Sequence, residues 1–509
     1  MQSTENNKKI AKNTLFLYMR MFFSMLVSLY TSRIVLSELG VTDFGIYNVV
    51  AGVVTLFAVL SATLANSTQR FLCIQEGDTE STAPKTRSIF SQFILLHFII
   101  AITVFVLSET VGIWFFFDKL NIPAPRQGAA FVVYQLSILL FVLNILKAPY
   151  DASLIVRQNM KIYAYIGMFE VVAKLLLVYM LSVFNYDKLI LYAILTAIVS
   201  IIVMIITIWY VLKNYPEFKF LYYWDGILFK SILGFVGWNY LTAIGDVARM
   251  QGLNIILNIF FGPAVNAARG IAFQIQASLI RFVTGFQTSV NPQLVILWSQ
   301  KEKKNMIVLM ARSSKFSFFL LLLFSAPVII NCDYILSLWL KEPPQFTADF
   351  CKLVLLQSLL ESMCYPMWTV IGAIGKLRVS HIIGTVLYLL IVIISYFVLK
   401  VGGSPISVFI ISIIFIVFVM TMLIFRINYL VNGYLSILVK QLVIRPIVVI
   451  FPMFVLYYVM QKMNLSNTLI TLLVSCVLIM LFQLIILFVI GLDKTERNKS
   501  INFIKAKLR

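Results

Sequence analysis

The feature that most constrains this chain is a series of apolar runs, about fourteen of them and each roughly 20 residues long. A run of that length crosses the roughly 30 Å hydrocarbon core of a bilayer as an α-helix. The runs are continuous rather than alternating, which favours helices over the strands of a membrane barrel. Hydrophobic residues make up 61% of the 509 residues and charged residues 12%, so little chain remains for a soluble domain. We therefore predict an all-α polytopic membrane protein.

The expected membrane spans follow directly from these runs. They cover residues 14–37, 45–65, 89–117, 129–150, 161–184, 189–212, 230–258, 264–290, 312–340, 349–373, 381–400, 405–425, 441–461 and 466–491. Segments 32–54 and 254–276 each end one span, turn at a glycine (Gly40 or Gly262) and enter the next. This faint internal repeat suggests two similarly arranged halves.

The distribution of lysine and arginine predicts the orientation of the chain. Most of the 41 basic residues fall on segments that share one side of the membrane, including Lys8, Lys9, Lys12 and the tail from Lys494. The positive-inside rule then places both termini in the cytoplasm. We interpret the net charge of +20 as a signal for orientation and anionic lipid rather than for nucleic acid. No small-residue cleavage pattern follows the first span, so we expect it to be retained.

Several chemistries lack the residues that they need. The G-A-I-G-K run at 372–376 has the wrong spacing for an ATP-binding P-loop and lacks the following serine or threonine. Only two histidines occur, and the five cysteines show no C-x-x-C spacing, so no metal site is expected and the cysteines are interpreted as packing residues. The longest hydrophilic segment, 66–88, is too short for a catalytic domain. We expect a transporter, not an enzyme, with no cofactor.

Charged residues inside the spans are the candidate functional residues, because each costs at least about 2.5–3.5 kcal/mol in hydrocarbon. The deep basic residues are Arg20, Lys174, Arg249 and Arg281, and the deep acidic ones are Glu170, Asp246 and Glu361. Helical spacing predicts the pairs Glu170–Lys174 and Asp246–Arg249, which leaves Arg20 and Arg281 without a local partner. The three acids are candidates for coupling to a proton or sodium ion, or else are paired structural charges. Basic residues near span ends are expected to snorkel to the headgroups: Arg33, Arg269, Lys352 and Arg445.

Polar residues form stripes on three of the spans. The first span carries Asn13, Arg20, Ser24, Ser28 and Thr31 on one face, and the seventh carries Asn239, Thr242, Asp246 and Arg249. In the eighth, Arg269, Gln276 and Gln287 share a face, while Arg281 points about 120° away. Such stripes line a solvated central cavity or, alternatively, join helices by hydrogen bonds.

The N-terminal region resembles a known family of membrane proteins. An S-R-x-x-L-x-x-L-G run is followed by D-F-G-I-Y, which places the motif on Ser32, Arg33, Leu36, Leu39 and Gly40, and on Asp43, Phe44, Gly45, Ile46 and Tyr47. This pattern is similar to the start of Wzx-type polysaccharide biosynthesis flippases. They belong to the multidrug/oligosaccharidyl-lipid/polysaccharide (MOP) exporter superfamily, which also contains multidrug exporters of the MATE class and the lipid II flippase.

The resemblance implies an architecture for the whole chain. It has two six-helix lobes, residues 1–228 and 229–428, around a central cavity, while 429–509 adds two helices and a basic cytoplasmic tail. By resemblance, the cavity would hold the pyrophosphate of the cargo on Arg20, Arg249 and Arg281, and its Asn, Gln, Ser and Thr side chains would meet sugar hydroxyls. Arg33, Gly40 and Asp43 would belong to the motif or a gate.

The resemblance also implies a function. The cargo would be an undecaprenyl-pyrophosphate-linked oligosaccharide repeat unit, moved from the inner to the outer leaflet of a bacterial cytoplasmic membrane by alternating access, for O-antigen or capsule assembly. Its partners would be membrane lipids and other glycan-assembly proteins. The alternatives are a MATE-like drug or cation exporter and a membrane glycan polymerase or ligase. The short outer loops disfavour the polymerase or ligase.

Overall fold

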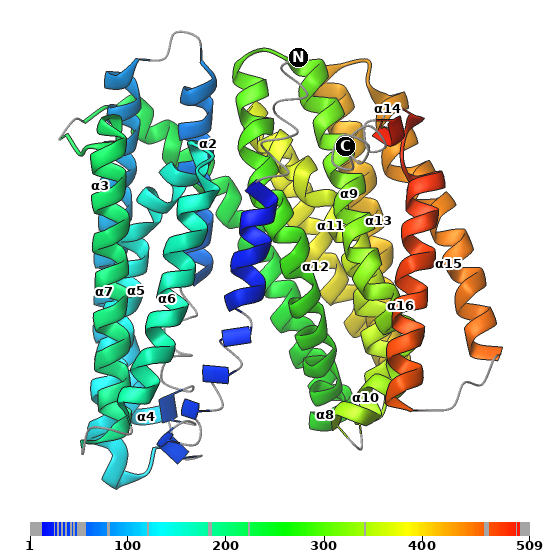
Figure 1. Ribbon diagram of the computed structural model, residues 1–509, viewed down its shortest axis with the longest axis horizontal. Coiled ribbons are helices and arrows are strands. Elements are labelled where there is room, and N and C mark those ends of the chain that lie inside the picture. The colour runs from blue at the N-terminus through cyan, green and yellow to red at the C-terminus, as the bar shows by residue number, and fades with distance from the viewer. Residues whose placement is uncertain are drawn as a thin grey trace, which may run out of the picture. The chain divides into compact units, whose positions relative to one another are not determined.

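The computed structural model consists of helices joined by short connections (Figure 1). The residues that it describes are a broken set within 13–47, then 58–78, 82–119, 122–181, 186–221, 224–340, 343–462, 468–494 and 496–498. By its internal contacts the chain divides into two compact units. Unit 1 is Met1–Tyr240 with Thr288–Lys301, and unit 2 is Leu241–Gln287 with Glu302–Arg509.

Unit 1 is a bundle of long helices. Its described helices are α2 (Ala58–Gly77), α3 (Ala83–Leu107), α4 (Ile113–Lys119), α5 (Gln127–Val156), α6 (Met160–Met180), α7 (Lys188–Asn214) and both ends of α8 (Gly226–Ser299). Helix α5 is central, since it packs against α2, α3, α6 and α7. A short 3-10 turn, η3 (Pro216–Phe218), begins the connection from α7 to α8.

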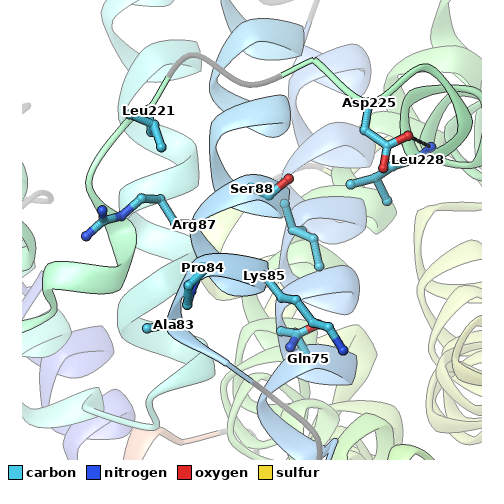
Figure 2. A pocket seen from close by; sticks show the side chains of 10 residues that line it. Gln75, Ala83, Pro84, Lys85, Arg87, Ser88, Leu221, Asp225 and Leu228 are labelled. Carbon is cyan, nitrogen blue, oxygen red and sulfur yellow. Dashed lines mark hydrogen bonds between the residues drawn. The ribbon is translucent and has the colours of Figure 1, made fainter.

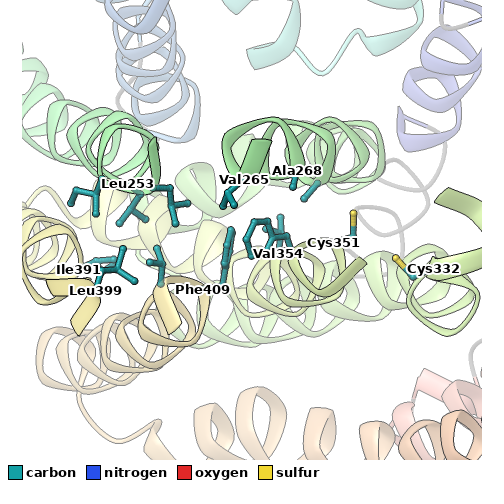
Figure 3. Packing of buried hydrophobic residues seen from close by; sticks show 14 of the residues in the cluster. Leu253, Val265, Ala268, Cys332, Cys351, Val354, Ile391, Leu399 and Phe409 are labelled. Atoms are coloured by element: carbon teal, nitrogen blue, oxygen red, sulfur yellow. The ribbon is translucent and has the colours of Figure 1, made fainter. Parts of the chain in front are cut away.

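Unit 2 contains the middle of α8 and all later helices. These are α9 (Lys303–Ile330), α10 (Cys332–Leu340), α11 (Thr347–Ile374), α12 (Arg378–Lys400), α13 (Ile406–Val431), α14 (Leu435–Val439), α15 (Arg445–Lys462) and α16 (Leu469–Ile486). Helix α11 packs against α9 and α13. Between α8, α11, α12 and α13 lies an apolar core in which Phe350 meets Phe409 at 4.4 Å between ring centroids (Figure 3).

Polar residues at helix starts show why several helices begin where they do. The carboxylates of Asp187 and Asp225 accept backbone N–H groups in the first turns of α7 and α8. Thr468 and Thr471 form a reciprocal capping box at the start of α16. These caps satisfy N–H groups that have no partner within the helix.

Two glycines confirm the turns predicted between consecutive spans. Helix α8 is two helices that meet at Gly262, whose φ of 76° and ψ of −172° are not helical. Gly40 likewise has a φ of 75°. A side chain would be strained at either position, because residues with a Cβ rarely adopt positive φ.

The all-α membrane fold is confirmed. Ten described helices are long and apolar enough to cross a membrane, and they overlap ten of the predicted spans. The largest difference is at 312–340, where the membrane helix is Lys303–Ile330 and the separate helix α10 follows it. Two further predicted spans, 264–290 and 349–373, are helical within α8 and α11. Most of the first span, 14–37, is described and helical, whereas residues 48–57 of the second span lie outside the described residues. The lobe boundaries at 228 and 428 and the orientation stay predictions.

The C-terminal segment is tied to unit 2 by ion pairs. The buried Lys315 of α9 donates to Glu496 at 2.6 Å, and Arg445 of α15 pairs with Asp493. Burial alone would raise the pKa of Asp493, but the hydrogen bond from Gln441 and the charges of Lys315, Arg445 and Arg312 hold it below its ordinary value. The Arg445 guanidinium also donates to the carbonyl of Gly491, so the end of the last span holds it in place, and its expected position at the headgroups stays a prediction.

Candidate functional site

Unit 1 holds a cluster of five charged side chains, which we call the unit 1 cluster: Arg20, Lys147, Asp151, Glu170 and Lys174. Glu170 and Lys174 on α6 pair at 2.7 Å, which confirms the predicted pair. Lys147 and Asp151 on α5 approach within 3.5 Å. The charges of Arg20 and Lys147 act on both carboxylates, so the five groups form one electrostatic unit. Three cations face two anions, and the cluster has a net positive charge.

Arg20 lies against one face of α6. Its guanidinium carbon is 4.4 Å from the centre of the Tyr163 ring, a cation–π contact. One turn further along, a Cβ built on Gly167 would lie 2.2 Å from the Arg20 Nε, so only glycine leaves room for this side chain. Among the described residues, no carboxylate lies within 4.0 Å of the Arg20 nitrogens. Its half-buried guanidinium is therefore held in place by packing, and its charge acts on Asp151 and Glu170 without a direct ion pair to any described carboxylate.

The other polar residues of the first span have mixed environments. Asn13 is buried, and the adjacent Thr14 hydroxyl meets Ser289 at 2.7 Å. Ser24 is half-buried, and Thr31 donates to the carbonyl of Val27 in its own helix at 2.7 Å. Ser28 lies outside the described residues. Their expected place in a cavity stays a prediction.

A second cluster, which we call the unit 2 cluster, is centred on Arg249. This arginine is 5% exposed, and its Nη2 is 2.7 Å from Asp246 and 3.5 Å from Glu361 of α11. The predicted Asp246–Arg249 pair is confirmed. Glu361 also accepts from Gln357 at 2.8 Å, and the Tyr388 ring lies 5.2 Å from the guanidinium. Two carboxylates share one cation here, so Asp246, Arg249 and Glu361, which make up this cluster, together carry a net negative charge. The charge of Arg269 also acts on Arg249 from nearby. The Asp246 side chain is 48% exposed and is the accessible member.

Further polar residues of α8 are held by local contacts. Thr242 hydrogen-bonds to Nδ1 of His381, whose ring lies 5.2 Å from that of Trp368. The Asn239 amide donates to the carbonyl of Phe235 at 2.8 Å. These contacts account for the polar stripe of the seventh span without requiring a bound ligand.

The stripe predicted on the eighth span is only partly accessible. Gln287 is buried, and its amide donates to Ser317 at 3.1 Å and to the carbonyl of Ser362 at 3.2 Å, so packing within unit 2 accounts for it. Gln276 is half-buried. Arg281 is exposed and has no ionic partner among the described residues. Its proposed role toward pyrophosphate stays a prediction.

Arg269 corrects one expectation from sequence. It is buried instead of snorkelling, and it donates to Asn254 at 3.2 Å and to the carbonyl of Met250 at 2.9 Å. The turn at Gly262 brings the start of the eighth span back alongside the end of the seventh, where these acceptors lie. Lys352 likewise has a partner, since it pairs with Asp333 at 2.9 Å.

The sequence motif has a structural role at Asp43. Arg126 donates to Asp43 at 2.8 Å and to Asp187 at 2.6 Å, and so joins three segments of unit 1. Burial alone would raise the pKa of Asp187, but hydrogen bonds from Arg126 and from the start of α7 hold it below its ordinary value. A second pair, Lys188–Glu38, reinforces the same end at 2.8 Å. Arg33 lies outside the described residues, so its role as a gate stays a prediction.

The structure adds three charged residues that the sequence interpretation did not single out. Lys147 and Asp151 lie at the end of a predicted span, and their i,i+4 spacing was a usable signal for a pair. Arg126 had no such signal, because both its partners are distant in sequence. Within the described ranges, no three His, Cys, Asp or Glu side chains are grouped so as to hold a metal ion.

Comparisons with known proteins identify the fold. No family model matches the chain, and no curated protein sequence matches it. Among solved structures, it is similar to an outward-facing multidrug resistance MATE family transporter of the MOP superfamily. The TM-score is 0.72 at 13% identity, over 84% of this chain and 97% of that one.

Two further structures give the same result. A MATE protein in complex with MaD3S has a TM-score of 0.67 at 15% identity, over 84% of this chain and 97% of its own. A MOP superfamily transporter from Pyrococcus furiosus also has a TM-score of 0.67 at 15% identity, over 84% of this chain and 97% of its own. The reverse polarity of that transporter's binding pocket is described as suggesting a different function. At these identities the likeness shows a MATE-like transporter fold.

Proposed function

We propose that this protein is a flippase that moves undecaprenyl-pyrophosphate-linked oligosaccharide repeat units from the inner to the outer leaflet of the cytoplasmic membrane by alternating access. The MATE-like fold supports a transporter of the MOP type. The S-R-x-x-L-x-x-L-G and D-F-G-I-Y runs support the polysaccharide branch. Surface glycan assembly would then depend on the protein.

The observation that carries this proposal is the net positive charge of the unit 1 cluster. Arginine presents a planar fork that binds phosphate oxygens through two parallel hydrogen bonds. Arg20 is oriented by Tyr163 and Gly167 and forms no ion pair with a carboxylate in the described part of the chain, so the fork is available to an anion. Lys147 and Lys174 add positive charge nearby, reduced by their pairing with Asp151 and Glu170. A pyrophosphate fits such a group better than a cationic drug does.

The unit 2 cluster supplies the candidate for ion coupling. Arg249 neutralises one of two nearby carboxylates, Asp246 and Glu361, which leaves one negative charge for a proton or a sodium ion. Glu170 is a weaker candidate because Lys174 already pairs with it. In this proposal Arg249 orients the two carboxylates and does not bind pyrophosphate directly.

The test is to replace Arg20. In cells with matched membrane levels, Arg20→Ala is expected to abolish surface glycan and to leave the undecaprenyl-linked repeat unit on the cytoplasmic leaflet. Arg20→Lys is expected to rescue only partly, since an ammonium keeps the charge and loses the fork. Lys161→Ala, which removes an exposed cation elsewhere on α6, is the matched control and should transport normally. Normal surface glycan in an Arg20→Ala, Arg249→Ala, Arg281→Ala variant would overturn the proposal.

A MATE-like exporter of cationic compounds is the second candidate. The similar structures are MATE transporters, and the net negative unit 2 cluster suits a cation. Efflux of a cationic dye separates the two functions. An exporter should keep efflux in Arg20→Ala, whereas a flippase should lose glycan export in that variant. Asp246→Asn should impair either function, because Asp246 is a candidate for cation binding in an exporter and for ion coupling in a flippase.

A further inference from the structure

Unit 1 contains a cavity of about 790 Å³ that shares no residue with the unit 1 cluster. It lies where the end of α2 and the first turns of α3 meet the connection between α7 and α8 (Figure 2). The lining includes Gln75 of α2 and Lys85, Arg87 and Ile89 of α3. It also includes Leu221 and Asp225 of the connection and Leu228 at the start of α8. By the predicted orientation, this end of unit 1 faces the cytoplasm.

Positive charge exceeds negative charge in the lining. Lys85 is exposed and has no ionic partner among the described residues. Arg87 donates to the carbonyl of Pro216 at 3.0 Å, and its Nε is buried without a partner. Among the described lining residues Asp225 is the only acid, and its carboxylate already accepts the N–H groups of Ile227 and Leu228 at 2.9 and 3.0 Å. The cavity is therefore suited to a small anionic group.

The connection beside the cavity has the composition of a segment at the membrane surface. Leu221, Trp224 and Ile227 are 56%, 54% and 86% exposed, and Phe220 is exposed as well. Exposed lysines at 219 and 230 flank them. Aromatic and aliphatic side chains mixed with lysine are typical of the headgroup region, where apolar parts enter the lipid and charges stay in water. The mouth of the cavity should therefore border lipid headgroups.

We propose that this cavity binds the headgroup of an anionic glycerophospholipid. Its phosphate would lie by Lys85, and its glycerol and first methylenes would contact the apolar lining residues Ile89, Leu221 and Leu228. Arg87 extends in the opposite direction from Lys85 in Figure 2 and adds positive charge to the lining. In Figure 2 the Lys85 side chain extends toward Gln75 and away from Asp225, so the cation and the acid of the cavity are separated. This site is independent of the proposed transport, because its residues belong to neither charged cluster.

The experiment measures lipid retained by the full-length protein in nanodiscs of phosphatidylglycerol and phosphatidylcholine, by native mass spectrometry. A lysine near the membrane surface contributes roughly 1 kcal/mol to the binding of anionic lipid, so Lys85→Gln is expected to weaken retention of phosphatidylglycerol about fivefold. Asp225→Asn keeps a good helix cap while it removes the negative charge, and is expected to tighten retention. The control Lys219→Gln, Lys230→Gln removes two nearby charges outside the lining and should weaken retention less than Lys85→Gln does.

Three results would overturn the site. The first is equal loss in the control and in Lys85→Gln, since it would mean diffuse attraction to the surface. The second is displacement of the retained lipid by inorganic phosphate as effectively as by dioctanoyl phosphatidylglycerol, which would indicate a simple anion site. The third is a retained mass that matches a polyprenyl-pyrophosphate glycan instead of a phospholipid. Because Lys85 is exposed, its replacement should not affect folding, and the measurement remains interpretable.

Discussion

Replacing Gly167 by alanine would show whether the position of the Arg20 guanidinium matters for transport. A Cβ at this position would lie 2.2 Å from Nε, 2.7 Å from Cζ and 3.0 Å from Cδ of Arg20. Ordinary contacts between such atoms are about 3.5–4.0 Å, so the guanidinium has to move by roughly 1–2 Å. The moving atoms belong to the end of a flexible side chain, and helix α6 itself need not shift.

Transport should fall in this variant while the stability of the protein stays unchanged. Alanine is favoured over glycine inside a helix by about 1 kcal/mol, which offsets the cost of moving Arg20. A hydrogen bond to a charged group contributes about 1.5–3 kcal/mol, so losing the contact between Arg20 and phosphate should weaken substrate binding by a factor of about 10 to 150. The expected protein is as stable as wild type and deficient in export.

The assay combines thermal unfolding of the purified protein with surface glycan measured at matched membrane levels. Gly234→Ala is the matched control, because it makes the same substitution within a helix of unit 1 with no atom within 4 Å of the new Cβ. In an Arg20→Ala background, Gly167→Ala should have no further effect on export, and a double-mutant cycle measures this. Wild-type export by a stable Gly167→Ala protein would refute the reasoning.

The remaining predictions concern the other charged groups and the topology. Arg249→Met should destabilise the protein by about 3–5 kcal/mol in thermal or denaturant unfolding, because it leaves a buried carboxylate unpaired. Adding Glu361→Gln should restore part of this loss. Additive effects of the two substitutions would show that Arg249 and Glu361 do not interact. The pKa of Asp187 is lower in the folded protein, so its contribution to stability is present above about pH 4 and is lost as pH falls through the folded pKa. Asp187→Asn should therefore flatten the acid side of the pH–stability profile, and an unchanged profile would contradict this. Cysteines introduced in the tail 492–509 should be labelled only from the cytoplasm and those in 118–128 only from outside; a tail labelled from outside would make the count of fourteen spans wrong.

Features that depend on neighbours along the chain were predictable. Span length follows from hydropathy alone, and the predicted spans overlap the candidate membrane helices wherever those are described. The pairs Glu170–Lys174 and Asp246–Arg249 follow from helical spacing, and both form. The turn at Gly262 was predictable because this residue lies between two consecutive spans, and its positive φ forms that turn.

Features that depend on which helix faces which were decided by the tertiary structure. Glu361 joins Arg249 from a helix more than a hundred residues further along the chain, and Arg126 joins Asp43 to Asp187. Arg269 was expected at the headgroups and is instead buried against carbonyls of the preceding span. The sequence contains no signal for these contacts, because a long side chain near a span end can reach either water or a neighbouring helix.

The tertiary structure also decided the net charge of each candidate site. The sequence by itself determined that the chain is a helical membrane protein and that a few charges lie inside it, since burying them in lipid is costly wherever the helices go. Whether a charge is cancelled depends on how each helix is rotated and on which helices are its neighbours. Hydropathy predicts neither, because the apolar faces of the helices are alike. Packing therefore left the group around Arg20 with a surplus of cations and the group around Arg249 with a surplus of carboxylates.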